Sequence, residues 1–200
     1  MTYDIILAGV GGQGVLSLAA IVAKAAMLDG LYVRQSEVHG MAQRGGAVLA
    51  HLRISDEPIA GDLVPSGGAD MILAMEPLES LRYLSYLKPE GIVVSASEPV
   101  VNIPDYPELE KVLGAVRALP RSLLVDAAGI AKEAGSPKAV NMALAGAASL
   151  MLPVKLASIE RGVDELFGAK DPQAAAASRK AIELSRAAHA AGARAKGGAE

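Results

Sequence analysis

The stretch GVGGQG, which begins at Gly9, directly follows the apolar run YDIILA. Gly9, Gly11 and Gly14 fit the pattern G-x-G-x-x-G, which permits a tight turn, close approach of a phosphate and close packing of a helix on a strand. Gly12 and Gln13 make this turn open and polar, and amides at the start of a following helix favour an anion. A bound dinucleotide, another phosphate-bearing ligand and a turn packed against another subunit would each account for these residues.

A second polar stretch, SEVHGMAQRGGAV, contains Glu37, His39, Gln43, Arg44 and Gly45. We expect it near the first stretch, because both follow strands at one edge of a parallel sheet. The imidazole titrates near neutrality and the guanidinium binds phosphates or carboxylates through two hydrogen bonds, although a structural histidine and a solvated arginine remain alternatives. The acidic residue that binds the ribose of a dinucleotide usually lies about 20 residues after the glycine motif. Glu37 lies 28 residues after Gly9, which is later than this spacing.

The hydrophobic pattern predicts how these two stretches are positioned. A helix over 15–30 that ends at a glycine, between apolar strands, forms a strand–helix–strand unit. The alternation predicts an α/β fold: a Rossmann-like, open, mostly parallel sheet with helices on both faces and a helical C-terminal third. We expect strands at 3–8, 31–38, 46–55, 71–76, 91–97 and 122–127, and further helices at 77–87, 109–119, 128–135, 138–152, 154–167 and 172–192.

Composition excludes several classes of function. The formal net charge of −3 argues against nucleic acid or an anionic membrane as a partner, and the absence of cysteine removes disulfides and thiolate-bound clusters. We find no nucleophile elbow, no zinc-binding H-E-x-x-H and no Walker lysine, and therefore expect no catalytic and no metal-binding residues. The N-terminus lacks the features of a signal peptide and no apolar window is long enough to cross a membrane, so we expect a cytoplasmic protein.

Three motifs in register carry a family resemblance: GVGGQGVLSLAAIVAKAAMLDG, SEVHGMAQRGGAVLAHLRIS and LVPSGGADMILAMEPLESLRYLSYL. Together with KAVNMALAGAASLMLP, they resemble the gamma component of the 2-oxoacid:ferredoxin oxidoreductase family, and within it the small (beta) subunits of the indolepyruvate enzymes. The resemblance covers roughly residues 1–160. It implies a gamma-type α/β domain over 1–170, followed by an Ala-rich helix and tail over 171–200, which we expect to be peripheral.

The resemblance implies a non-catalytic subunit, inactive alone, of a heteromeric enzyme that converts an arylpyruvate to an acyl-CoA and reduces a ferredoxin-type acceptor. Thiamine diphosphate and iron–sulfur clusters would belong to a large catalytic partner, since this chain has no cysteine and its GDL stretch lacks the downstream asparagines of a thiamine diphosphate motif. This chain would bind no cofactor by itself and would help to form a shared entry for coenzyme A.

The residues that would face this entry are Gly9, Gly11, Gly12, Gln13, Gly14, Gln43, Arg44 and Gly45, with Glu37 and His39 at the substrate or the interface. An independent NAD(P)-binding reductase and a scaffold subunit without a ligand are the alternatives.

Overall fold

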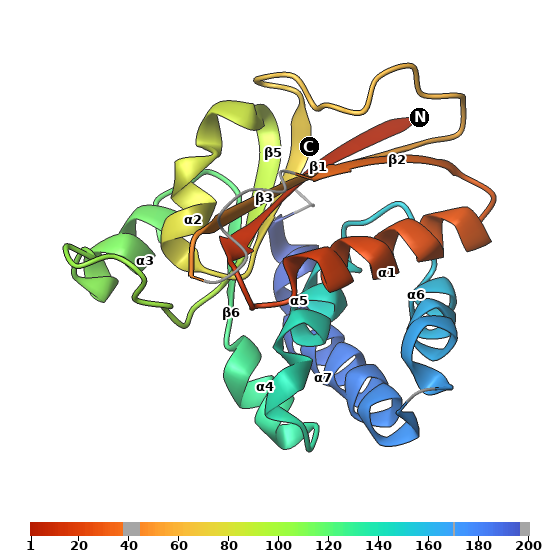
Figure 1. The fold of residues 1–200 in the computed structure, drawn as a ribbon. Coiled ribbons are helices and arrows are strands. Elements are labelled where there is room, and N and C mark those ends of the chain that lie inside the picture. Colours follow the sequence, from red (N-terminus) through yellow and green to blue (C-terminus); the bar gives the residue numbers. More distant parts are fainter. Residues whose placement is uncertain (38–44, 170, 197–200) are drawn as a thin grey trace.

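The chain folds around a sheet that has six strands within the described residues, as the computed structural model shows (Figure 1). The structure describes residues 1–37, 45–169 and 171–196. The strands are β1 (Thr2–Val10), β2 (Tyr32–Glu37), β3 (Ala47–Ser55), β4 (Ala69–Ala74), β5 (Leu87–Ala96) and β6 (Ser122–Val125). The α-helices are α1 (Val15–Leu28), α2 (Pro77–Arg82), α3 (Leu109–Arg117), α4 (Ala127–Glu133), α5 (Val140–Ala148), α6 (Leu156–Val163) and α7 (Pro172–Lys196).

The strand order is β2-β3-β1-β4-β5-β6. Strands β1, β4, β5 and β6 pair in parallel, whereas β3 pairs antiparallel with both β1 and β2. The sequence prediction of a mostly parallel α/β sheet is therefore confirmed. Because β3 is antiparallel to both of its neighbours, β1 and β2 run in the same direction, but they do not touch. The strand–helix–strand unit at the N-terminus thus has a third strand inserted between its two strands.

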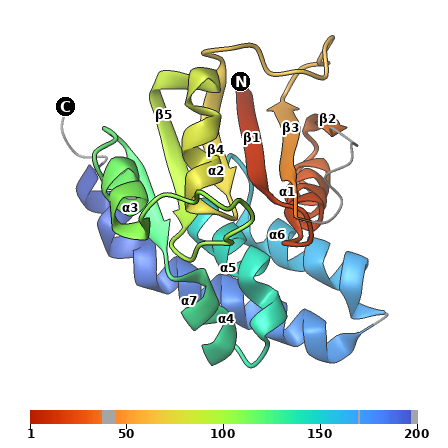
Figure 2. The ribbon, with the colours of Figure 1, turned by 60° about the vertical axis from the view of Figure 1, so that its left-hand side comes forward.

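Helices cover both faces of the sheet, as the sequence predicts (Figure 2). The reason is visible in β1, where Ile5 and Leu7 belong to one apolar cluster and Ile6 and Ala8 to the other. All four side chains are fully buried, so both faces of the strand need a cover. Helices α1, α4, α5, α6 and α7 contribute to the first cluster, and α2 and α3 cover the opposite face.

Helix α7 packs into the same core as α1 and α5, although the sequence alone favours a peripheral helix there. Its Ala175, Ala181 and Ile182 are buried. Small residues permit this close contact: a Cβ atom added at Gly146 of α5 would lie 2.4 Å from the Ile182 carbonyl oxygen. Among the helices of the described ranges, none combines the length and apolar character that a membrane crossing requires.

Candidate functional site

The glycine-rich turn lies at the carboxyl end of β1 and leads into α1. Its glycines are needed for two different reasons. Gly12 and Gly14 have φ angles of 101° and 86°, in the left-handed region that favours glycine. At Gly9 the reason is close packing, because an added Cβ would lie 2.8 Å from Val15 Cγ2 and 3.0 Å from Met75 Cβ. The turn therefore brings α1 unusually near the ends of β1 and β4.

The side chain of Gln13 joins the ends of two parallel strands. Its Oε1 accepts a hydrogen bond from the Val10 amide at 2.7 Å, and its Nε2 donates to the Met75 carbonyl at 2.9 Å. Val10 ends β1 and Met75 directly follows β4. Gln13 is predicted from the sequence to be a ligand-binding residue, but in the structure the oxygen and the nitrogen of its side-chain amide both bond to the backbone and hold the turn against the sheet.

The start of α1 is open to an anion. Its N-cap is Gly14, no side chain of the described residues caps the helix, and its first turn holds no acidic residue. A helix leaves its first amides without partners inside the helix, and its dipole puts partial positive charge there. Gly12 is exposed and has nothing within 4 Å of the position that a Cβ would take, so the backbone is accessible.

The end of the second polar stretch contacts this turn. The Gly11 amide donates to the Gly46 carbonyl at 2.8 Å, and the Gly45 amide donates to the Gly11 carbonyl at 3.3 Å. The expectation that the two stretches meet is thus confirmed for these glycines. The predicted site residues His39, Gln43 and Arg44 lie outside the described residues.

Glu37 is the last residue of β2 and is partly buried. The side-chain Nε2 of Gln35 donates a hydrogen bond to the Glu37 carboxylate. Since β3 lies between β2 and β1, Glu37 is two strands away from the glycine turn, a separation of about 10 Å. In a dinucleotide site the acidic residue ends the strand next to β1, so this order does not favour the dinucleotide alternative.

A third loop, between β5 and α3, completes this edge of the sheet and was missed by the sequence analysis. The Asn102 side chain donates to the Gly45 carbonyl at 3.0 Å. On either side of it, the Tyr106 hydroxyl and the Val100 amide (3.4 Å) donate to Oε1 of Glu76, which directly precedes α2. No local pattern signals these bonds, because they link residues 24 to 57 positions apart.

Carboxylates follow the other parallel strands at the same edge. Glu76 is buried and caps α2 through the Glu79 amide at 2.9 Å. Asp126 caps α4 through the Gly129 amide. Burial and the neighbouring Asp126 raise the pKa of Glu98. In the described ranges, no group of three or more histidines or acids could hold a metal ion. The acids lie beyond β4, β5 and β6, so an anionic ligand is favoured at the α1 end of this edge.

Burial and the adjacent Glu76 carboxylate raise the pKa of Tyr106 well above its ordinary value. The phenol therefore remains protonated and donates its hydrogen bond to Glu76 at any physiological pH.

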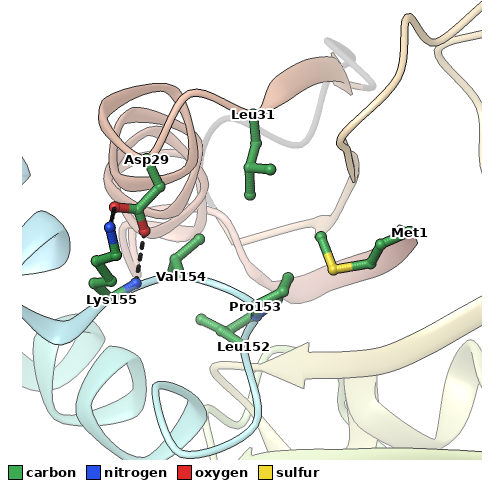
Figure 3. A pocket seen from close by; sticks show the side chains of 7 residues that line it. All are labelled: Met1, Asp29, Leu31, Leu152, Pro153, Val154 and Lys155. Atoms are coloured by element: carbon green, nitrogen blue, oxygen red, sulfur yellow. Dashed lines mark hydrogen bonds and ion pairs between the residues drawn. The ribbon is translucent and has the colours of Figure 1, made fainter.

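A pocket of about 360 Å³ lies at the opposite end of β1 and α1 (Figure 3). In it Lys155 contacts Asp29, the residue after α1, through its backbone amide at 2.7 Å and its ammonium at 3.8 Å. Burial acts against a low pKa of Asp29, but hydrogen bonds from Ser158 and Lys155 outweigh it and lower that pKa. Helix α1 spans about 21 Å over its 14 residues, so the pocket is remote from the glycine turn. It is lined by Met1, Asp29, Leu31, Leu152, Pro153, Val154 and Lys155.

Comparison with known proteins relates this chain to one family. The family model described as pyruvate ferredoxin/flavodoxin oxidoreductase matches residues 4–188. The indolepyruvate oxidoreductase subunit IorB of Archaeoglobus fulgidus is 38% identical over 179 residues, which cover 85% of this chain and 88% of that relative. The gamma subunit of a keto/oxoacid ferredoxin oxidoreductase from Geobacter sulfurreducens is a structural neighbour with a TM-score of 0.69 and 26% identity, over 94% of this chain and 99% of that one.

A larger enzyme contains the same fold. The 2-oxoglutarate:ferredoxin oxidoreductase of Magnetococcus marinus, solved with 2-oxoglutarate, coenzyme A and succinyl-CoA bound, matches 95% of this chain with a TM-score of 0.74. The sequence identity is 21%, so the likeness concerns the fold alone, and the match spans 31% of that chain.

Proposed function

The chain belongs to the pyruvate ferredoxin/flavodoxin oxidoreductase family, and from this membership we propose that it is the non-catalytic small subunit of an indolepyruvate-type enzyme. The complex oxidatively decarboxylates an arylpyruvate to the acyl-CoA and passes the electrons to a ferredoxin-type acceptor. The observation that carries the substrate class is the similarity to an indolepyruvate oxidoreductase subunit over most of both chains.

Thiamine diphosphate and the iron–sulfur clusters belong to the large companion subunit in this proposal. The chain has no cysteine, so it offers no thiolate to a cluster. The residues that follow GDL do not fit a thiamine diphosphate motif either, because its asparagines are missing. We therefore derive no catalytic step from the residues of this chain.

The role of this chain is to form part of the coenzyme A entry. Coenzyme A carries phosphates, and when bound it supplies the thiol that accepts the acyl group. The glycine turn fits such an anion, because in the described part of the chain α1 has neither a side-chain cap nor an acid in its first turn, and the backbone at Gly12 is accessible. Gly45 contacts this turn, so the preceding Gln43 and Arg44 are proposed to add side-chain donors.

Reconstitution tests the proposed function. The chain alone and the chain with its large companion are assayed for reduction of a dye by indolepyruvate, with and without coenzyme A. We expect activity only from the pair and only with coenzyme A. Turnover by this chain alone with NAD(P) would favour the reductase alternative, and equal activity of the large subunit alone would contradict a role in the reaction.

The variant Arg44→Ala tests the coenzyme A contact within the assembled pair. Loss of a charged hydrogen bond should raise the KM for coenzyme A about tenfold and leave assembly intact. Arg117→Ala is the matched control, because Arg117 is exposed on α3 and forms a surface ion pair with Glu110 at 3.4 Å. An unchanged KM in Arg44→Ala would contradict the assignment of coenzyme A to this loop and favour the scaffold alternative.

A further inference from the structure

We propose that Asn102 is a positioning residue for the glycine turn: through Gly45 it sets the place of Gly11 and with it the coenzyme A contact. The inference rests on the proposed function in so far as coenzyme A is the ligand of the turn. The positioning itself is a property of this chain and has a readout of its own, as described below.

Two consecutive hydrogen bonds connect Asn102 to the turn. Its Nδ2 donates to the Gly45 carbonyl at 3.0 Å, and the Gly45 amide donates to the Gly11 carbonyl at 3.3 Å. Gly11 is further bound through its own amide to Gly46 at 2.8 Å. Gly11 therefore lies between the end of β1 and Gly45, which Asn102 holds, and a displacement of Gly45 acts directly on Gly11.

The Asn102 loop is itself fixed to the sheet on both sides of this residue. The Val100 amide and the Tyr106 hydroxyl donate to the same carboxylate oxygen of Glu76. Glu76 is 1% exposed and follows β4, the parallel neighbour of β1. Hydrogen bonds to Glu76 therefore tie the loop to the sheet on both sides of Asn102.

Gly45, which Asn102 holds, has no side chain with which to pack. Among the described residues, nothing lies within 4 Å of the position that a Cβ would take at Gly45, and the φ angle of 75° is in the left-handed region. Glycine loses more backbone entropy on ordering than any other residue. Polar bonds must therefore fix this segment. Val101, beside Asn102, is 68% exposed, so the loop does not act by apolar packing at this point.

The variant Asn102→Asp removes the donor and keeps the size of the side chain. Loss of one hydrogen bond, about 1 kcal/mol, should raise the KM for coenzyme A about fivefold in the reconstituted pair. We expect kcat and the KM for indolepyruvate to be unchanged, because Asn102 is not placed at the reacting atoms. Asn102→Gln retains the donor, so its KM for coenzyme A should stay within about twofold of the wild-type value. Val101→Ala is the control in the same loop.

Amide hydrogen exchange in the same complex separates the two levels of the proposal. We expect faster exchange at Gly11 and Gly45 in Asn102→Asp, and no change in Val101→Ala. Unchanged exchange at both glycines would overturn the positioning role, whatever the kinetics. Faster exchange with an unchanged KM for coenzyme A would overturn the functional role of Asn102. If Arg44→Ala also leaves this KM unchanged, the coenzyme A assignment fails as well.

Discussion

Replacement of Gln13 by alanine should destabilise the chain by about 2 kcal/mol. The side chain makes two hydrogen bonds, to the Val10 amide at 2.7 Å and to the Met75 carbonyl at 2.9 Å, and both are partly buried. Each such bond contributes about 0.5–1.5 kcal/mol net, and removing the partner leaves a backbone group unpaired. For a chain of this size, a loss of about 2 kcal/mol lowers the midpoint of thermal unfolding by about 4–8 °C.

The measurement is urea unfolding of the purified chain with linear extrapolation to water, alongside the thermal midpoint. Gln173→Ala is the control, because Gln173 is exposed in the first turn of α7 and alanine is a good helix former there. Gln13→Glu adds a sharper comparison, since it keeps the acceptor for Val10 but turns a carboxylate oxygen towards the Met75 carbonyl. If the free energy of unfolding of Gln13→Ala lies within about 0.5 kcal/mol of the wild-type value, the two hydrogen bonds of Gln13 do not stabilise the turn.

Two further predictions concern packing and pH. Gly146→Ala should destabilise the chain by about 1–3 kcal/mol, because the added methyl group would overlap the backbone of Ile182. Gly114→Ala lies on an open helix face and should instead stabilise the chain by about 0.4–1 kcal/mol. The same urea unfolding experiment measures both. His51 accepts a hydrogen bond from the Val64 amide at 3.1 Å through Nδ1, and burial lowers its pKa. The unfolded chain therefore binds this proton more readily, so the contribution of His51 to stability is complete above pH about 6.5 and is lost as the pH falls below it. Unfolding of the wild type and His51→Gln from pH 8 to pH 5 tests this sign: the difference between them should shrink towards low pH, and a constant difference would contradict it.

Much of the fold follows from the pattern of the sequence. In β1 an unbroken apolar run predicts a strand buried on both faces, and helical spacing after the glycines predicts α1. The position of β3 did not follow, because its alternation indicates a strand without showing its neighbours. Its place depends on long-range register, such as Ile5 opposite Leu52, which no local pattern encodes. The packing of α7 could not be predicted either. Its Ala-rich sequence offers only a narrow apolar face, and its close contact with Gly146 of α5 appears only in the folded structure.

The candidate site was predictable in its backbone and less so in its side chains. The glycine positions point to a phosphate because the requirement for glycine is local. The role of Gln13 depends on Met75, 62 residues away, and that of Asn102 on Gly45, 57 residues away. Such bonds join segments that only the folded sheet brings together. An asparagine in a proline-containing loop carries no sign of its partner, so geometry alone reveals it.

The inserted strand explains why two glycine-rich segments meet at all. In an antiparallel pair the end of one strand faces the start of the other, and here Val10 lies opposite Ala47. The residues that precede β3 must therefore lie beside those that follow β1, as the bonds of Gly11 with Gly45 and Gly46 show. From the sequence, this contact was expected because β1 and β2 would be parallel strands that end at the same edge. In the structure, however, β2 lies two strands away from β1. The antiparallel β3, which begins beside the end of β1, therefore brings Gly45 and Gly46 to the turn.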